Sequence, residues 1–195
     1  MPDPVVLGFD TSAAHCAAAL LVRDAVVVRA EPMQKGQAER LMPLLQEVLA
    51  EGGVGWSDLT AIGVGVGPGN FTGTRIAVSA ARGLALGLGV PAVGVTSFEA
   101  AAHEIARPIT VTVPAMRGQV YAQRFDSGGA SAPTLCRPDD LAGPVIASPP
   151  PGDLAAAIAR IAAGRAASGK ERPAPLYIRP ADAAPPREAP PAILP

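Results

Sequence analysis

The stretch GVGVGPGNFTGTR at residues 63–75 decides the fold expected for this chain. An apolar run leads into it and an Ala-rich run follows Thr72, so its five glycines indicate a turn between a strand and a helix. Such turns often cradle phosphate groups. However, the sequence has no Gly-Lys pair of the Walker type here, and Gly67, Gly69 and Gly73 are spaced GxGxxxG rather than GxGxxG. Two interpretations stay open: a sharp structural turn with Thr72 as the helix cap, or a loop that borders a nucleotide.

The segments on both sides of this loop predict the order of strands and helices along the chain. We expect strands at 5–10, 16–22, 25–31, 60–66 and 91–95, and helices at 42–51, 72–88 and 97–106. Pro43 limits the first helix, because a proline in a helix interior costs about 3 kcal/mol; we expect that helix to start near Met42 or to be kinked there. The order βββαβαβα predicts a ribonuclease-H-like α/β domain over residues 1–106.

The second half of the chain repeats the opening more weakly. A shift of 104 residues places 109–115 on 5–11 and 120–125 on 16–21, which predicts a duplicated fold. The second copy is degenerate: within a smaller domain at 107–180 we expect only one further strand at PVIAS and one helix at 153–167, capped by Asp153. Residues 181–195 are rich in proline and are expected to form an extended tail.

Composition bounds the class of protein. The chain has 195 residues, of which 49% are apolar, and this is ample for a packed core. Its net charge of −1 gives no basic surface for unaided binding to nucleic acid or to an acidic membrane. Cys16 and Cys136 lack CxxC or histidine neighbours, so we expect reduced, buried thiols. No basic leader and no apolar stretch of membrane-spanning length is present. We therefore expect a cytoplasmic protein.

The titratable residues do not assemble a catalytic motif. Asp10 ends the first strand, but the residue that matches it in the second half is Pro114, so the acid pair of a phosphotransferase is missing. We interpret Asp10 as an acceptor of local hydrogen bonds from Thr11 or Ser12. His15 is expected to face solvent, and the two histidines do not form an HxxxH zinc motif. We expect no metal site and no catalytic residue in this chain.

The helix expected at 72–88 has unusually few charges. Arg75 and Arg82 are its only charged residues, although a surface helix is normally polar over about half its circumference. Two stripes of apolar or small residues run along it: Ile76, Ser79, Gly83 and Leu86 form one, and Val78, Ala81, Ala85 and Leu88 form the other. The pattern predicts burial on two sides, one against the sheet and one against either a partner protein or the second domain.

Five stretches together closely resemble the TsaB (YeaZ) family over nearly the whole chain: FDTS (9–12), AERLMPLLQEVL (38–49), residues 65–100 from GVGPGNFTGTR onward, RGQVYAQRF (117–125) and PLYIR (175–179). The resemblance implies a fold like that of the actin-like ATPases. It also implies a non-catalytic partner of the TsaD enzyme, which makes threonylcarbamoyladenosine beside the tRNA anticodon with TsaE as accessory ATPase. Association is implied through a bundle built from the first two helices.

The resemblance places roles on particular residues. The implied partner interface contains Glu39, Leu41, Leu45, Val48, Arg75, Val78, Ala81, Arg82 and Ala85. The candidate nucleotide-bordering loop contains Asp10, Gly67, Gly69, Asn70 and Thr72, with ATP or ADP an option only at the complex interface. We expect tRNA contact only through the complex, and self-pairing of this chain when it is alone. Two departures from the family pattern weaken the nucleotide role: Gly36-Gln37-Ala38 replaces a His-Ser pair, and Pro114 replaces an aspartate. The alternatives are a weak ATP-binding protein or ATPase, and a protease.

Overall fold

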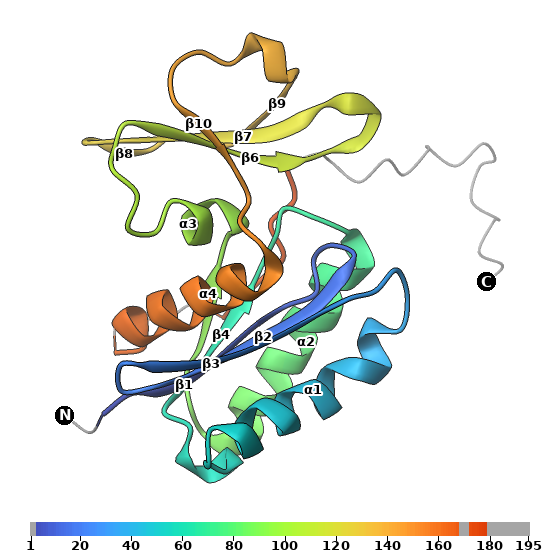
Figure 1. Ribbon diagram of the computed structural model, residues 1–195, viewed down its shortest axis with the longest axis vertical. Coiled ribbons are helices and arrows are strands. Elements are labelled where there is room, and N and C mark those ends of the chain that lie inside the picture. Colours follow the sequence, from blue (N-terminus) through green and yellow to red (C-terminus); the bar gives the residue numbers. More distant parts are fainter. Residues whose placement is uncertain (1–2, 168–171, 179–195) are drawn as a thin grey trace, which may run out of the picture.

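A five-stranded mixed sheet forms the first layer of the computed structural model, which describes residues 3–167 and 172–178 (Figure 1). Its strands lie in the order β3-β2-β1-β4-β5, with bounds β1 Val5–Asp10, β2 His15–Val22, β3 Ala25–Pro32, β4 Ala61–Gly65 and β5 Ala92–Val95. The first three strands pair antiparallel as a meander, and β4 and β5 continue the sheet parallel to β1. The predicted strands are confirmed to within one residue at each end.

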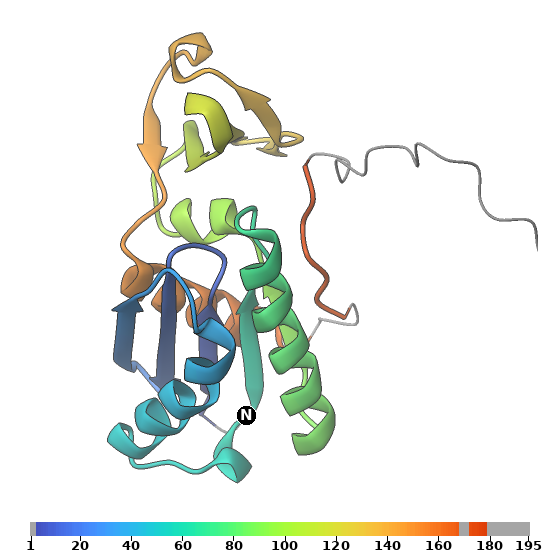
Figure 2. The ribbon, with the colours of Figure 1, turned by 90° about the vertical axis from the view of Figure 1, so that its right-hand side faces the viewer.

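Two helices cover one face of this sheet, α1 (Gln37–Glu51) and α2 (Phe71–Leu88). Figure 2 shows them side by side in front of the strands. Leu44 and Leu45 of α1 and Ala77 of α2 are fully buried against the sheet. The prediction that α1 starts near Met42 is wrong, since Pro43 lies inside the helix. Pro43 is on the exposed side, where solvent can satisfy the carbonyl that its missing N–H leaves free.

Helix α4 (Pro151–Arg165) covers the opposite face of the first sheet. We expected this helix to belong to the smaller domain at 107–180, but it packs on β1, β2 and β4 of the first sheet. Gly8 and Gly63 explain the close fit, because a Cβ at either position would come within 3 Å of the α4 backbone. Asp153 does not cap the helix as expected; the N-cap is Pro150, which makes no side-chain cap.

A second sheet lies beyond the carboxyl end of β1 (Figure 1). Its order is β10-β6-β7-β8, with β9 also pairing with β7. The bounds are β6 Ile109–Pro114, β7 Val120–Asp126, β8 Gly129–Ala130, β9 Thr134–Cys136 and β10 Val145–Ala147. Helix α3 (Ser97–Ala101), five residues shorter than predicted, buries Phe98 against this sheet. The first lobe is defined here as the first sheet with α1, α2 and α4, and the second lobe as the second sheet with α3.

The strand pairing of the second lobe matches that of the first. Strand β6 pairs antiparallel with β7 and parallel with β10, as β1 pairs antiparallel with β2 and parallel with β4. The strands predicted from the 104-residue shift are therefore present. Between β9 and β10 the chain has only a short 3-10 turn, Pro138–Asp140, at the place that corresponds to α1. Two further 3-10 turns lie at Trp56–Asp58 and Met116–Gly118.

The segment 172–178, called the strap below, runs back along the first lobe. The Leu176 N–H donates to the carbonyl of Val66 at 2.8 Å, just after β4 ends. The Leu176 side chain packs against the cores of both lobes. The strap therefore joins the two lobes beside the glycine loop. The predicted tail at 181–195 lies outside the described residues.

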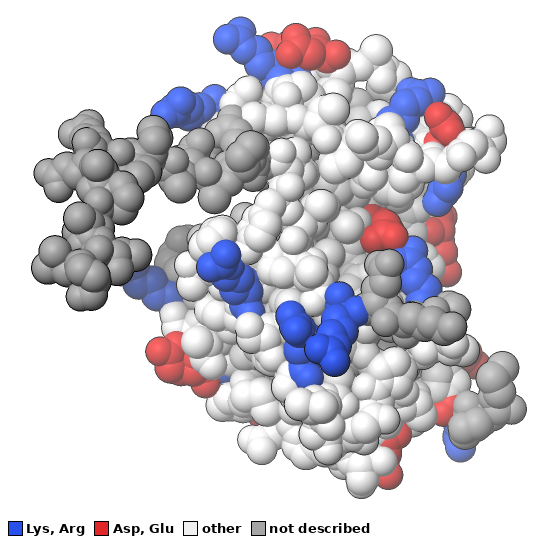
Figure 3. Space-filling model, turned by 180° about the vertical axis from the view of Figure 1, so that it is seen from behind, with Lys and Arg blue, Asp and Glu red and all other residues white. Residues whose placement is uncertain are grey.

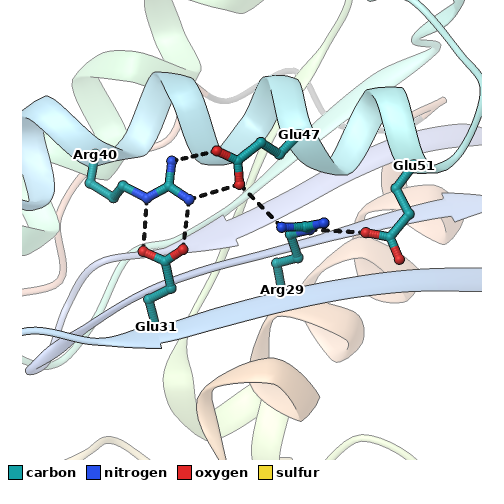
Figure 4. A network of polar contacts seen from close by, with 5 residues as sticks. All are labelled: Arg29, Glu31, Arg40, Glu47 and Glu51. Atoms are coloured by element: carbon teal, nitrogen blue, oxygen red, sulfur yellow. Dashed lines mark hydrogen bonds and ion pairs between the residues drawn. The ribbon is translucent and has the colours of Figure 1, made fainter.

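Ion pairs tie α1 to the edge strand β3 (Figure 4). Arg40 lies 2.6 Å from Glu31 and 2.7 Å from Glu47, and Arg29 lies 2.9 Å from Glu51. Hydrogen bonds from Arg40 hold the pKa values of the Glu31 and Glu47 carboxyls below their usual range, and those carboxylates raise the pKa of Arg40. No helix in the described part of the chain is long and apolar enough to cross a membrane.

Candidate functional site

A pocket of about 360 Å³ lies between the lobes, at the carboxyl end of β1. The first lobe contributes the loop between β1 and β2 and the glycine loop, and the second lobe contributes the end of β6. The residues that line it are Ser12, Ala13, Ala14, His15, Gln34, Gln37, Pro68, Gly69, Asn70, Ser97, Val113, Pro114, Ala115, Met116, Tyr121, Ser148 and Leu154. The pocket is thus built by parts of the sequence that lie far apart.

A buried polar cluster around Asp10 forms one wall of the pocket. Asp10 Oδ2 accepts hydrogen bonds from the Ser12 N–H and hydroxyl, each at 2.9 Å, and lies 2.7 Å from His15 Nε2. The predicted local acceptor role of Asp10 is therefore confirmed. The prediction that His15 faces solvent is wrong, because β2 begins at His15 and turns its ring back over the end of β1, leaving it 8% exposed. Asp10 Oδ1 is buried without a partner among the described residues.

The glycine loop packs directly on the loop between β1 and β2. A Cβ at Gly69 would collide with the backbone of Ser12, and a Cβ at Gly73 would collide with the carbonyl of Thr11. Gly67 has a φ of +90°, as expected of a sharp turn. The expected cap at Thr72 is wrong: Asn70 caps α2 by accepting from the Gly73 N–H at 2.9 Å. Close packing thus accounts for these glycines without a phosphate.

Of the predicted nucleotide-bordering residues, Gly69 and Asn70 line the pocket, Asp10 stands behind it, and Gly67 and Thr72 are not in its wall. None of the described residues that line it is Lys, Arg, Asp or Glu. The polar side chains of the wall that no other described residue engages include the hydroxyls of Ser97, Tyr121 and Ser148 and the amide of Gln34. No group of three His, Cys, Asp or Glu side chains within the described ranges could hold a metal ion.

The predicted partner interface is corrected in part. Leu41, Leu45, Val48, Val78 and Ala81 are at most 3% exposed and pack between the helices and the sheet. They therefore do not form the centre of an exposed patch, and Ala85 is only partly exposed. Of the two stripes on α2, the one that contains Val78 and Ala81 packs on the sheet and is therefore not available to a partner. Glu39, Arg75 and Arg82 are exposed, as expected of residues near a rim.

The other stripe of α2 is uncovered except at Ile76, which packs in part against the core of the first lobe. Ser79, Gly83 and Gly87, spaced four residues apart, are exposed, and Leu86 beside them is 86% exposed. From α1, Met42 is 39% exposed on the neighbouring surface, with Gln46 one turn further on. These residues of α1 and α2 are called the outer helix face below. Small residues at this spacing let a second helix approach closely. Burial of this second side of α2 stays a prediction.

A cluster at the N-terminal end of this face was missed from the sequence. The ring of Phe71 at the start of α2 lies 5.5 Å from the ring of Tyr177 in the strap, and Arg75 contacts both. Tyr177 is 102 residues from Arg75, so no local pattern could place them together. The one sequence feature that connects Arg75 and Tyr177 is that both lie in stretches that resemble the TsaB family.

Comparisons with known proteins identify the family. A family model described as "TsaD: tRNA N6-adenosine threonylcarbamoyltransferase" matches residues 29–167. The TsaB proteins of Haemophilus influenzae and Escherichia coli are 33% and 32% identical, over 62% and 63% of this chain and 53% and 57% of their own lengths. The chain thus spans about half the length of the curated relatives it matches. The structure of YeaZ from Pseudomonas aeruginosa is 26% identical, with a TM-score of 0.73 over 89% of this chain and 99% of that one. The chain therefore belongs to the TsaD, tRNA N6-adenosine threonylcarbamoyltransferase, family, in which it is similar to the TsaB (YeaZ) proteins.

Proposed function

We propose that this chain is an accessory, non-catalytic subunit that binds a TsaD-type enzyme and supports transfer of the threonylcarbamoyl group to the adenosine beside the tRNA anticodon. The observation that carries the proposal is the outer helix face, a surface on two neighbouring helices with small residues at its middle. The names of the TsaB relatives, which describe threonylcarbamoyladenosine biosynthesis proteins, support the same reading.

Packing explains how this face takes a partner helix. No atom lies within 4 Å of where a Cβ would stand at Gly83 or Gly87, so a partner helix has room to approach α2 there. Leu86 is 86% exposed, so its burial by a partner would contribute most of the roughly 1.5–3 kcal/mol of a large apolar side chain, whereas Met42 is 39% exposed and would contribute less than half of that. Of the eight large hydrophobic side chains exposed among the described residues, four lie on α1, α2 or the strap beside α2: Met42, Phe71, Leu86 and Tyr177. Such clustering is typical of a protein-binding surface.

The pocket between the lobes contributes less to this function than the outer helix face does. The shared strand order of the two lobes supports a duplicated, actin-like fold in which the pocket occupies the ancestral cleft. Because no Lys or Arg stands among the described residues of its wall, we propose that ATP or ADP binds at the complex interface rather than in this subunit. Contact with the TsaE-type ATPase and with tRNA is likewise proposed to occur only within the complex. Without its partner, the chain is proposed to pair with itself through the outer helix face.

The test places an arginine on the outer helix face. Gly83→Arg would force an unpaired charge into the packed interface and should weaken binding of a TsaD-type subunit about 100-fold. Gly164→Arg is the matched control, since Gly164 is also an exposed helical glycine with no atom within 4 Å, but lies on α4. Titration calorimetry measures the affinity, and circular dichroism confirms that both variants fold. Equal affinity of Gly83→Arg and wild type would show that the partner does not bind this face.

A further inference from the structure

The cluster of Phe71, Arg75 and Tyr177 presents a positive charge that is already held in place. The guanidinium carbon of Arg75 lies 3.7 Å from the centroid of the Phe71 ring and 5.8 Å from that of Tyr177. Arg75 Nε donates to the Tyr177 hydroxyl at 2.8 Å. Since helical side chains lean toward the N-terminus, the guanidinium of Arg75 stacks over the first turn of α2. Ring stacking and one hydrogen bond thus restrict a side chain that is normally flexible.

Most of the hydrogen-bonding capacity of Arg75 is unused. A guanidinium has five N–H donors, and only the one on Nε is engaged by another described residue. Arg75 forms no ion pair with any described residue, and the first turn of α2 contains no acidic side chain. The helix dipole adds further positive potential at the same place. The two terminal nitrogens therefore form a fork that matches a carboxylate in two parallel hydrogen bonds.

The surroundings favour a protein partner at this point. Phe71 and Tyr177 are each 49% exposed, and exposed aromatic rings around an arginine are typical of residues that dominate interface energetics. Seen from behind, where α2 lies, the middle of the surface carries Lys or Arg side chains on an otherwise uncharged background, and the Asp and Glu side chains lie mostly towards the edges (Figure 3). The net charge of −1 argues against a nucleic-acid phosphate as the ligand.

We propose that Phe71, Arg75 and Tyr177 anchor the N-terminal end of the partner interface by receiving an aspartate or glutamate carboxylate from the surface of the partner protein. This inference rests on the proposed function and adds the chemistry of the contact. The strap takes part in binding, because it supplies Tyr177 and is fixed to the first lobe through the bond between the Leu176 N–H and the Val66 carbonyl. Since the arginine is held before binding, little side-chain entropy is lost when the complex forms.

The experiment measures binding of a TsaD-type subunit to the full chain at low and high salt. Arg75→Gln removes the charge and should weaken binding at least about tenfold, with a smaller salt dependence than wild type. Arg75→Lys keeps the charge but loses the fork, and should recover only part of the affinity. Tyr177→Phe keeps the ring and removes the hydroxyl that holds Arg75, and should weaken binding by about threefold to tenfold. Arg160→Gln, an exposed arginine on α4, is the matched control and should bind as wild type does.

The outcomes separate the two ideas. If wild type does not bind the TsaD-type subunit, the proposed function fails and this inference fails with it. If wild type binds and Arg75→Gln binds as tightly with the same salt dependence, only the anchor is refuted. If Arg75→Gln lowers the affinity of the isolated chain for tRNA and not for the protein, the ligand is a phosphate and the proposal is overturned. Melting temperatures of all variants exclude loss of fold as the cause.

Discussion

The contact between α4 and the first sheet can be tested at Gly8 in the middle of β1. An alanine there would place its Cβ 2.6 Å from Ala159 N, 2.8 Å from Ala155 O and 2.9 Å from Ala159 Cα. All three are backbone atoms of α4, so no side chain can rotate away. The helix must retreat by roughly 1 Å to restore normal contacts of about 3.5 Å. The change therefore strains the packing of an entire helix against the sheet.

The magnitude follows from overpacking. Adding a methyl group to a well-packed core costs about 1–3 kcal/mol, and replacing glycine by alanine in a strand returns about 0.5–1 kcal/mol. We expect Gly8→Ala to lower the free energy of unfolding by about 1–2 kcal/mol. For a chain of this size that corresponds to a fall in Tm of about 2–8 °C. Urea unfolding followed by circular dichroism, together with a thermal melt, measures both quantities.

The matched control for Gly8 lies on α4 itself. Gly164 is exposed and has no atom within 4 Å of where a Cβ would stand, so Gly164→Ala changes helix propensity alone. It should leave stability unchanged or raise it by up to about 1 kcal/mol. If Gly8→Ala proves as stable as wild type, α4 is not seated on β1 as described, and the account of the first lobe as a sheet covered on both faces is wrong.

Two further predictions concern charge and catalysis. Because hydrogen bonds from Arg40 lower the pKa values of Glu31 and Glu47 below 4.5 in the folded state, their stabilisation is present above pH 4.5 and is lost as the pH falls through the lowered values. Arg40→Gln should therefore unfold at lower urea than wild type at pH 7, and the two should converge as the pH falls through the lowered pKa values of Glu31 and Glu47; a difference that does not change with pH would contradict the role of the ion pairs. The isolated chain should show no ATP hydrolysis or peptide cleavage above background, because the described residues that line the pocket include no acid pair and no nucleophile paired with a base. Robust turnover that Asp10→Ala abolishes would refute this.

Much of the fold could be predicted from the sequence because its signals are local. Apolar runs bounded by Gly, Pro and Asp predicted the strands of the first sheet, since the sequence signal of a strand lies in residues that are adjacent along the chain. The 104-residue shift located β6 and β7 in the same way. The acceptor role of Asp10 also followed from neighbours only two positions away. These predictions did not require knowledge of which elements touch.

The candidate sites depended on contacts that the sequence does not encode locally. Adjacent residues on a helix point about 100° apart, so Val78 and Ser79 belong to different stripes, and only packing on the sheet decided that Val78 is buried and Ser79 exposed. His15 became buried because strand pairing returned it to Asp10, not because of its neighbours in the chain.

The sequence by itself determined the strands of the first sheet, β6, β7 and β10, the glycine loop, the sparse charge of α2 and the family, but not β8 or β9. Tertiary structure decided that α4 closes the first sheet, which side of α2 is uncovered, and that Tyr177 meets Arg75 across 102 residues. The physical reason is the range of the interactions. Backbone preference and hydrophobic periodicity act within a few residues, whereas burial is settled by the surface that each element finds once the chain is compact.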